Sequence, residues 1–325
     1  MIEAINLKKT YHTKVKKGLF KREKDIVEAV KGINLRLEQG QIIGLLGING
    51  AGKTTTIKML STLIKSTSGE IFIDGVEINE NPLKIKQKVN MIAGGERMIY
   101  WRLTGRENLW YYGQLYGIPD KVLKARIDRL ITLVGLNEKQ DVPVERYSKG
   151  MKQRLQIARG LINNPDYLFM DEPTLGLDAP IAKEIRAYIK KLAVEEQKGI
   201  LLTSHYIHEV EELCDYIYIL DHGEVILEGT AKTLSESTFE TKITVLELAE
   251  INPAIEATIQ KFALDEKAVI HEQTHAHIMR FESKNELTES LVKLIHSEKL
   301  PLSKLYVEAP KLEDTIIEIS RRVSI

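Results

Sequence analysis

The chain has 325 residues with 46 basic and 46 acidic side chains, a length that suits one large or two modest domains. Balanced charge excludes a general electrostatic attraction to nucleic acid or to an anionic membrane, so no nucleic-acid partner is expected. The single cysteine, Cys214, excludes an intrachain disulfide framework and is predicted to be a buried core thiol.

The N-terminal sequence lacks the apolar centre of a secretory signal. No later run reaches the roughly 18 apolar residues that a membrane span requires. These two observations predict a cytoplasmic chain without a membrane span of its own.

The first predicted elements are three segments that alternate apolar and polar residues, at 4–11, 28–37 and 69–75. This alternation is typical of half-buried strands, and it predicts a small antiparallel layer. Residues 12–26, between the first two segments, are dense in Lys and Arg. They are interpreted as an exposed hairpin tip or loop, with a membrane-surface patch as the alternative.

The next element is an apolar strand that ends in a glycine-rich turn and leads into a helix. The turn matches the phosphate-loop pattern G-x-x-x-x-G-K-[ST] through Gly47, Gly52, Lys53 and Thr54. Because the match lies between a strand and a helix, it specifies a phosphate-binding site rather than an ordinary turn.

This loop is expected to wrap the phosphates of a nucleotide with its backbone amides. The Lys53 side chain would bridge the outer phosphates, and the Thr54 hydroxyl would ligate Mg²⁺. Thr55, at the same helix end, would donate to a phosphate. The expected binding residues are Gly47, Asn49, Gly50, Ala51, Gly52, Lys53, Thr54 and Thr55.

From about residue 100 to 165 the chain is predicted to be mostly helical. Within this part, "YSKGM" runs into a helix-forming segment, so unpaired N–H groups and a positive helix end face outward there. Such an end can bind an anion, and Ser148 and Gly150 lie at it. An ordinary helix N-cap is the alternative role for Ser148.

Continuous apolar runs at 41–47, 166–173, 199–205 and 216–223 predict buried parallel strands. Asp171 and Glu172 follow four apolar residues, so both carboxylates emerge at the carboxyl end of one of these strands. Asp171 can hold Mg²⁺ through water, and Glu172 can orient or deprotonate an attacking water. The acidic pair is a weak signal by itself, but it becomes specific beside a phosphate loop.

The segment at 235–240 is interpreted as a linker, which divides the chain into a nucleotide-binding domain at 1–235 and a second domain at 236–325. The second domain shows strand and helix patterns in the order strand, helix, two strands, helix, strand, followed by a final helix. This order predicts a small α+β domain of ferredoxin-like type.

The phosphate loop, the acidic pair and "YSKGMKQR" together make residues 2–230 resemble the ATP-binding cassette (ABC) family of transport ATPases. The resemblance implies an α/β P-loop NTPase fold of ABC type. Its parts are a parallel-sheet core, an N-terminal antiparallel β-subdomain and a helical subdomain at about 100–165. The small α+β domain would be an accessory to it.

The resemblance also implies further site residues. Ser148 and Gly150 would contact the γ-phosphate of ATP bound to a second cassette, although "YSKGM" departs from the commonest "LSGGQ" at three positions. Lys149 adds a positive charge to this motif, and the "YSKGM" variant resembles exporter-type cassettes more than importers. Tyr11 would stack on adenine, Asp178 would make a polar contact with the partner subunit, and His205 would contact the γ-phosphate.

One family position does not match, because the loop after "VNMIA" lacks the expected glutamine. Glu96, or the flexible pair Gly94-Gly95, would have to replace it. A Glu96 carboxylate could ligate Mg²⁺ through water but would repel the γ-phosphate. The following apolar residues, Tyr100, Trp101 and Leu103, suit docking of a short helix from a membrane subunit, with core packing as the alternative for Trp101.

These features predict the ATP-binding and ATP-hydrolysing subunit of a membrane exporter. It would use ATP and Mg²⁺, dimerise with a second cassette, most simply as a homodimer, and drive a separate permease from the inner face of the membrane. The alternatives are a soluble cassette ATPase of translation or repair, a non-catalytic ATP-binding regulator, and an importer ATPase with a sensing tail. A second phosphate loop and a long heptad tract are absent from the sequence, which disfavours the first alternative. The presence of Glu172 and His205 disfavours the second.

Overall fold

The computed structural model describes residues 1–16, 22–93, 99–238, 241–273, 277–308 and 312–316. The chain divides into two compact units, Met1–Thr230 and Ala231–Ile325. The boundary predicted after residue 235 lies inside helix α8 (Ala231–Thr238). The linker interpretation of 235–240 is wrong for residues 235–238, because they complete this helix and the Ser235 hydroxyl donates back to the Ala231 carbonyl at 2.9 Å.

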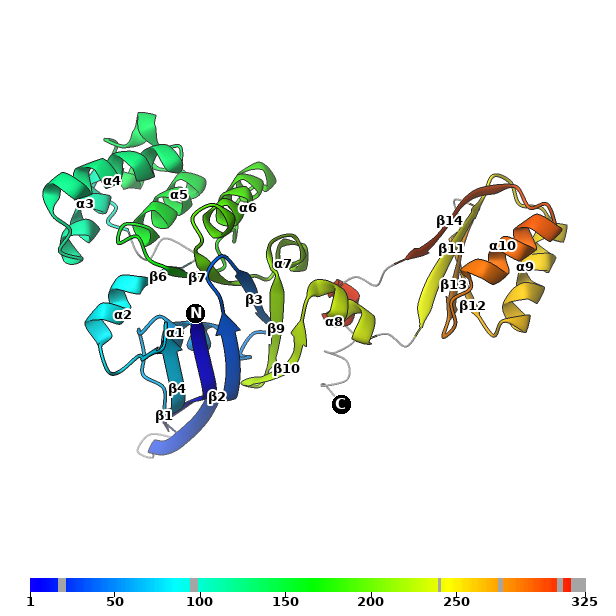
Figure 1. Ribbon diagram of the computed structural model, residues 1–325, viewed down its shortest axis with the longest axis horizontal. Coiled ribbons are helices and arrows are strands. Elements are labelled where there is room, and N and C mark those ends of the chain that lie inside the picture. The colour runs from blue at the N-terminus through cyan, green and yellow to red at the C-terminus, as the bar shows by residue number, and fades with distance from the viewer. Residues whose placement is uncertain (17–21, 94–98, 239–240, 274–276, 309–311, 317–325) are drawn as a thin grey trace. The chain divides into compact units, whose positions relative to one another are not determined.

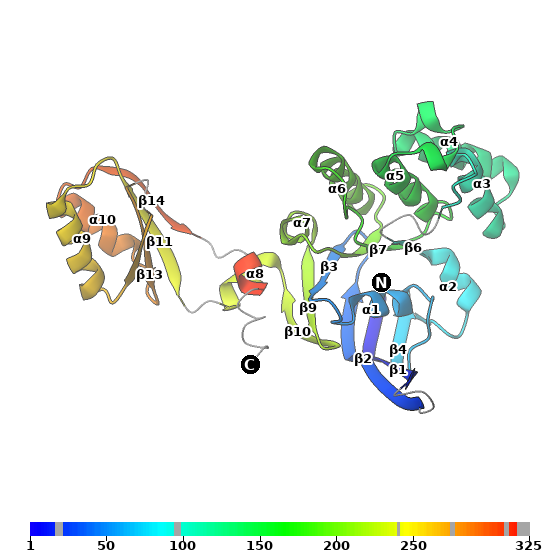
Figure 2. The same ribbon diagram turned by 180° about the vertical axis from the view of Figure 1, so that it is seen from behind.

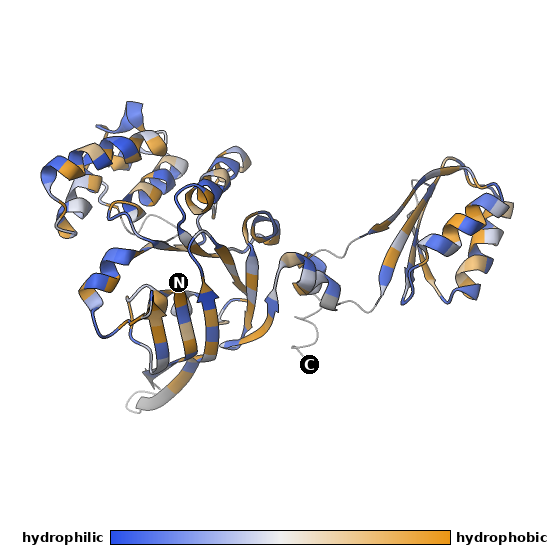
Figure 3. Ribbon diagram, in the orientation of Figure 1, coloured by the Kyte–Doolittle hydropathy of each residue, from blue (hydrophilic) through white to orange (hydrophobic). Residues whose placement is uncertain are grey.

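The N-terminal layer of the first unit is an antiparallel sheet with strand order β2-β1-β4-β5. Hydrophobic and hydrophilic residues alternate along these strands (Figure 3), as expected for a sheet with one buried face. The strands are β1 (Ile2–Lys16), β2 (Arg22–Leu37), β4 (Ser68–Ile73) and β5 (Val76–Glu77).

Much of the basic segment at 12–26 extends this sheet instead of forming a loop. The pairing of β1 with β2 continues along the segment to Lys16 opposite Arg22. Residues 17–21 lie outside the described part of the chain.

The core of the first unit is a six-stranded sheet with strand order β10-β9-β3-β8-β7-β6. The pairs of β3 with β8 and β9, and of β7 with β6 and β8, are parallel, while β10 pairs antiparallel with β9. All five residues of β8 are buried, which explains why this strand is a continuous apolar run. The strands are β3 (Ile42–Gly47), β6 (Val89–Ala93), β7 (Tyr167–Asp171), β8 (Gly199–Thr203), β9 (Tyr216–Asp221) and β10 (Glu224–Gly229).

Three helices form the predicted helical subdomain, α3 (Gly105–Leu115), α4 (Asp120–Leu133) and α5 (Lys149–Gly160), and they lie together in both views (Figures 1 and 2). Helix α3 starts where it does because Thr104 and Glu107 form a reciprocal capping box. Two 3₁₀ turns and four further helices complete the described residues of the first unit. They are η1 (Asn137–Lys139), η2 (Val144–Arg146), α1 (Lys53–Leu60), α2 (Pro82–Lys88), α6 (Ala179–Val194) and α7 (Ile207–Leu213).

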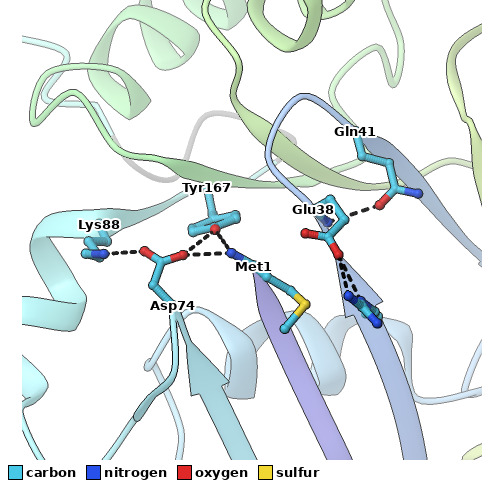
Figure 4. Close-up of polar contacts among 7 residues, drawn as sticks. Met1, Glu38, Gln41, Asp74, Lys88 and Tyr167 are labelled. Carbon is cyan, nitrogen blue, oxygen red and sulfur yellow. Dashed lines mark hydrogen bonds and ion pairs between the residues drawn. The ribbon is translucent and has the colours of Figure 1, made fainter.

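A polar network joins the antiparallel sheet to the parallel one (Figure 4). The Asp74 carboxylate accepts hydrogen bonds from the Met1 amino group and the Tyr167 hydroxyl, each at 2.7 Å, and pairs with the Lys88 ammonium. Burial raises the pKa of Asp74, but hydrogen bonds from Lys88, the amino terminus and Tyr167 outweigh it and lower the pKa to about 2. Asp74 is therefore ionised in the folded chain, and its charge holds β4 beside β7.

The second unit contains a four-stranded antiparallel sheet with order β12-β13-β11-β14. Helices α9 and α10 cover one face of this sheet (Figures 1 and 2), and residues of both enter its core. This is the predicted ferredoxin-like order of elements. The elements are β11 (Lys242–Leu248), α9 (Pro253–Asp265), β12 (Val269–Gln273), β13 (Ile278–Ser283), α10 (Thr288–Ser297) and β14 (Leu302–Glu308).

Within the described residues, none of the helices combines the length and apolar character needed to cross a bilayer.

Candidate functional site

The phosphate loop joins β3 to α1, as the sequence predicts. Gly47, Gly50 and Gly52 have φ angles of 149°, 87° and 100°, a backbone region that favours glycine. A Cβ at Gly47 would also collide with the Leu220 carbonyl oxygen, whereas nothing lies within 4 Å of a Cβ at Gly50. Packing therefore requires Gly47, and the turn conformation alone requires Gly50.

Lys53 points its ammonium into this loop. Its side chain is buried, and Nζ donates to the carbonyl oxygens of Gly47 at 2.5 Å and Ile48 at 3.1 Å. Burial lowers the pKa of Lys53, while the nearby charges of Glu172 and Asp171 oppose this change. Phosphate oxygens would be stronger partners for this cation than the two neutral carbonyls.

Asp171 ends β7 beside the start of α1. Its Oδ1 accepts a 2.8 Å hydrogen bond from the Thr203 hydroxyl, and its Oδ2 lies 3.5 Å from the Thr54 hydroxyl oxygen. A carboxylate and a hydroxyl at this separation are hard oxygen donors, which suit Mg²⁺ when phosphate and water complete its coordination. The described residues contain no group of three or more His, Cys, Asp or Glu side chains arranged to hold a metal by themselves.

Glu172 and His205 meet across the ends of adjacent strands. The His205 Nε2 lies 2.6 Å from Glu172 Oε1, and both side chains are partly accessible. Glu172 has a φ of 54°, and its backbone N–H donates to the Thr203 hydroxyl and the Thr203 carbonyl, each at 3.1 Å. This left-handed turn helps to direct the Glu172 carboxylate towards His205, and the two side chains have the chemistry that a general base and its orienting partner require.

Thr203 was not identified from the sequence, although it organises both members of the acidic pair. Its hydroxyl donates to the Asp171 carboxylate and accepts from the Glu172 N–H. The parallel pairing of β7 with β8 places Thr203 directly opposite Asp171. The sequence of either strand alone does not reveal which residues lie opposite each other, so Thr203 could not be found from the local pattern.

The predicted contacts to a second subunit lie at the starts of two helices. Ser148 caps α5 by accepting from the Met151 N–H at 3.2 Å, and Asp178 caps α6 by accepting from the Ile181 N–H at 3.2 Å. Both capping side chains are exposed. Gly150 is buried, and a Cβ there would lie 2.7 Å from Ile181 Cδ1, so a larger residue would displace the Ile181 side chain of α6. The N-cap role of Ser148 is confirmed, and its contact with a partner's phosphate stays a prediction.

The remaining predicted site residues differ in how far the structure describes them. Tyr11 is half-buried with the Lys9 ammonium 5.3 Å from its ring centroid, and its stacking on adenine stays a prediction. Asn49 is exposed, Ala51 is buried and Thr55 is half-buried. Glu96 lies outside the described residues, as does the Gly94-Gly95 pair.

An exposed aromatic surface covers part of the helical subdomain. Its members are Tyr100, Trp101, Trp110 and Tyr111, and the rings of Tyr100 and Tyr111 meet edge to face with centroids 5.0 Å apart. The Lys152 ammonium lies 4.7 Å from the Trp101 ring centroid. Core packing of Trp101 is therefore wrong, because half of its side chain is exposed. Trp110 and Tyr111 were not predicted from the sequence, because it is the fold of α3 that brings Tyr111 against Tyr100 and exposes Trp110 one residue before it.

Comparison with known proteins places these motifs in one family. The ABC transporter family matches residues 30–175. The ABC transporter ATP-binding protein NatA of Bacillus subtilis is 41% identical over 218 residues, 67% of this chain and 88% of the relative. The linearmycin resistance ATP-binding protein LnrL of Bacillus subtilis is 34% identical over 322 residues, 99% of both chains.

A solved structure gives the same result for the fold. A dimeric ATP-binding cassette in a post-hydrolysis state bound to ADP and Pi aligns with a TM-score of 0.61 at 26% identity. The alignment covers 71% of this chain and 98% of that one.

Proposed function

The chain belongs to the ABC transporter family, and on this premise we propose that it is the ATP-hydrolysing subunit of an exporter that acts with a separate membrane permease. One observation carries the exporter assignment. The similarity to a resistance ATP-binding protein runs through 99% of both chains, so it includes the second unit as well as the cassette. A protein that removes a toxic compound from the cell needs an outward transport step, which ATP hydrolysis would drive.

The residues at the strand ends divide the chemistry between them. Lys53 and the loop amides bind the outer phosphates of ATP. Glu172 takes the proton from the attacking water, and His205, at 2.6 Å, orients the Glu172 carboxylate and donates to the γ-phosphate. Thr54 and Asp171 would hold Mg²⁺, which offsets the negative charge of the phosphates.

Two copies of the chain would close around two ATP molecules. The exposed caps Ser148 and Asp178 would then face the nucleotide and the loops of the partner. The positive start of α5 in one copy would then bind the γ-phosphate held by the phosphate loop of the other copy. This arrangement explains why the Ser148 hydroxyl lies at an exposed helix start. The dimeric ATP-binding cassette bound to ADP and Pi supports this proposal by analogy.

The aromatic surface would receive the permease. Four exposed aromatic residues, of which Tyr100 and Tyr111 contact each other, are more typical of a protein interface than of a solvated helix. Trp and Tyr also dominate the binding energy of many interfaces. We infer that a short permease helix packs on Trp101 and Trp110. These aromatic residues come soon after 94–98 in the sequence, the segment where the family has its sensing glutamine.

Phosphate release by the purified chain is the direct test of the ATPase assignment. Hydrolysis should require Mg²⁺, should stop when EDTA removes the metal, and should return when Mg²⁺ is added back. A chain that binds ATP with Mg²⁺ but releases no phosphate, alone or with its permease, would instead be a non-catalytic regulator.

A resistance assay tests the exporter assignment. Loss of the gene in its native host should increase sensitivity to an exported toxic compound, and the wild-type gene should restore resistance whereas Lys53→Ala should not.

Co-purification tests the docking surface, because Trp110→Ala should weaken binding of the chain to the permease. The exposed Val194 of α6 provides the control, because Val194→Ala removes an exposed apolar side chain of the same unit that is not one of the four aromatic residues.

A further inference from the structure

A buried carboxylate behind the hydrolysis site has no role in the chemistry described so far. Glu209, on α7, is 1% exposed. Its two oxygens accept from the Thr174 hydroxyl at 2.8 and 2.9 Å, and one of them also accepts from the Ser204 hydroxyl. The Ser204 oxygen in turn accepts from the Tyr206 N–H at 3.0 Å.

These partners belong to the two loops that carry the catalytic groups. Thr174 lies two residues after Glu172, on the loop that continues to Asp178. Ser204 immediately precedes His205. One buried carboxylate therefore joins the loop of the general base to the loop of its histidine partner.

Stability alone does not explain a charged group at this position. Burying an ionised carboxylate costs free energy that neutral hydroxyl partners offset only in part. An apolar side chain packed on α7 would stabilise the core at lower cost. What the carboxylate adds is a directional connection, since it can accept from both loops at once and hold them at a fixed separation.

We propose that Glu209 is a positioning residue that keeps Glu172 and His205 aligned during hydrolysis. By holding Thr174 and Ser204 together, it preserves the 2.6 Å contact between the two catalytic side chains. It also transmits any displacement of the Asp178 loop, where a second subunit would bind, to His205. This inference rests on the proposed ATP hydrolysis and adds a connection between the two loops.

The first test is Glu209→Gln, which keeps the size of the side chain but replaces one accepting oxygen with a donating amide nitrogen. The kcat of ATP hydrolysis should fall by about 10- to 100-fold while the affinity for ATP is unchanged, because the phosphate loop is untouched. The matched control is Glu212→Gln on the same helix, where the exposed carboxylate pairs with Arg186 at 2.8 Å. Its kcat should stay within about twofold of the wild-type value.

A double-mutant cycle separates positioning from general damage. Thr174→Val removes one hydroxyl partner while keeping the shape of the side chain, and it should also lower kcat. Combining it with Glu209→Gln should lower kcat no further than the stronger single substitution does, because both break one connection. If the two effects multiply, the residues act separately and the proposed connection is wrong. Thr174→Val also tests the contact if Glu209→Gln does not fold.

Hydrogen exchange gives a readout that does not depend on activity. In Glu209→Gln, peptides covering 173–178 and 203–208 should both exchange faster, while peptides of the phosphate loop exchange as in the wild type. Faster exchange in a chain whose wild type releases no phosphate would reject the ATPase function but retain the connection. Wild-type exchange in both peptides, or a wild-type kcat in Glu209→Gln, would overturn the inference.

Discussion

The two principal sheets of the molecule place their charged side chains in opposite ways. In the six-stranded sheet of the first unit, charges gather at the carboxyl ends of the strands, where Lys53, Asp171, Glu172 and His205 lie. In the four-stranded sheet of the second unit, charges lie across the face opposite the helices. They form the pairs His271–Glu282, Arg280–Glu308 and Lys304–Glu247.

The difference shows how the placement of a charge indicates its role. The charges of the second sheet are partly exposed. Two of the pairs join neighbouring strands, and Arg280–Glu308 reaches across β11, so all three solvate an open face and contribute little free energy. In the first sheet, a buried cation and two carboxylates converge on one edge, beside backbone N–H groups that a helix start leaves unpaired. Such an arrangement suits a ligand that carries phosphate groups.

The largest effect should follow from removing the cation of the phosphate loop. Lys53→Ala should abolish measurable ATP binding, because no other side chain of the loop offsets the charge of the outer phosphates. The control is Lys304→Ala, which removes an exposed cation that lies 3.3 Å from Glu247 in the second sheet. Equilibrium titration with ATP measures the affinity of both variants. Wild-type affinity in Lys53→Ala would show that this cation contributes no more to ATP binding than a surface cation of the second sheet does.

The next effect concerns the general base. Glu172→Gln should retain ATP binding but slow hydrolysis by roughly 10²- to 10⁴-fold, since an amide cannot accept the proton from water. The variant should accumulate as an ATP-bound dimer on size-exclusion chromatography. Glu282→Gln, which breaks the 3.0 Å pair with His271, provides the control in the second sheet. Equal turnover in the two variants would show that Glu172 has no part in the reaction.

The sequence predicted those features that depend on a local pattern. Gly47 to Thr54 follows a fixed spacing, and continuous apolar runs identified the parallel strands before Asp171 and His205. Features that depend on register or tertiary contact were missed. Thr203 opposite Asp171 is one example, and the buried Glu209 is another, because an acidic residue in "HEVEEL" is indistinguishable in sequence from its exposed neighbours. The end of α8 was also missed, since Ser and Thr are poor helix formers unless their hydroxyls bond back to the helix.

Truncating the core of the second sheet tests whether the two units are stable separately. Phe281 is fully buried and meets Phe262 edge to face, with ring centroids 5.9 Å apart. Phe281→Ala should destabilise the second unit by about 3–5 kcal/mol. Limited proteolysis of Phe281→Ala should then cleave within 231–325. The control Val269→Ala, at an exposed position of the same sheet, should be cleaved no faster than the wild type.

ATP affinity of Phe281→Ala, and of a chain that ends at Thr230, should equal that of the full chain. Assembly with the permease or its regulation should be impaired, because the second unit carries none of the cassette motifs. Loss of ATP binding in either variant would contradict independent units and would remove the basis for comparing the two sheets separately.

The smallest effect comes from a carboxylate at the surface whose role is structural. Asp74→Asn weakens the network with Lys88, Tyr167 and the amino terminus. It should lower the free energy of unfolding by no more than about 1 kcal/mol at pH 7, because solvent screens the charge of this exposed carboxylate. The pKa of Asp74 falls from 3.8 to about 2 on folding, so the stabilisation is complete well above pH 3.8 and is lost as the pH falls towards 2. The difference between wild type and variant should therefore shrink steadily below about pH 5.

Both tryptophans, Trp101 and Trp110, belong to the first unit, so their fluorescence during urea unfolding reports on this unit alone. The control Glu282→Gln breaks an exposed pair of the second sheet and should leave that transition unchanged. A difference that stayed constant from pH 7 to pH 3 would mean that the Asp74 charge contributes nothing, and that its hydrogen bonds hold the two sheets equally well when the side chain is neutral.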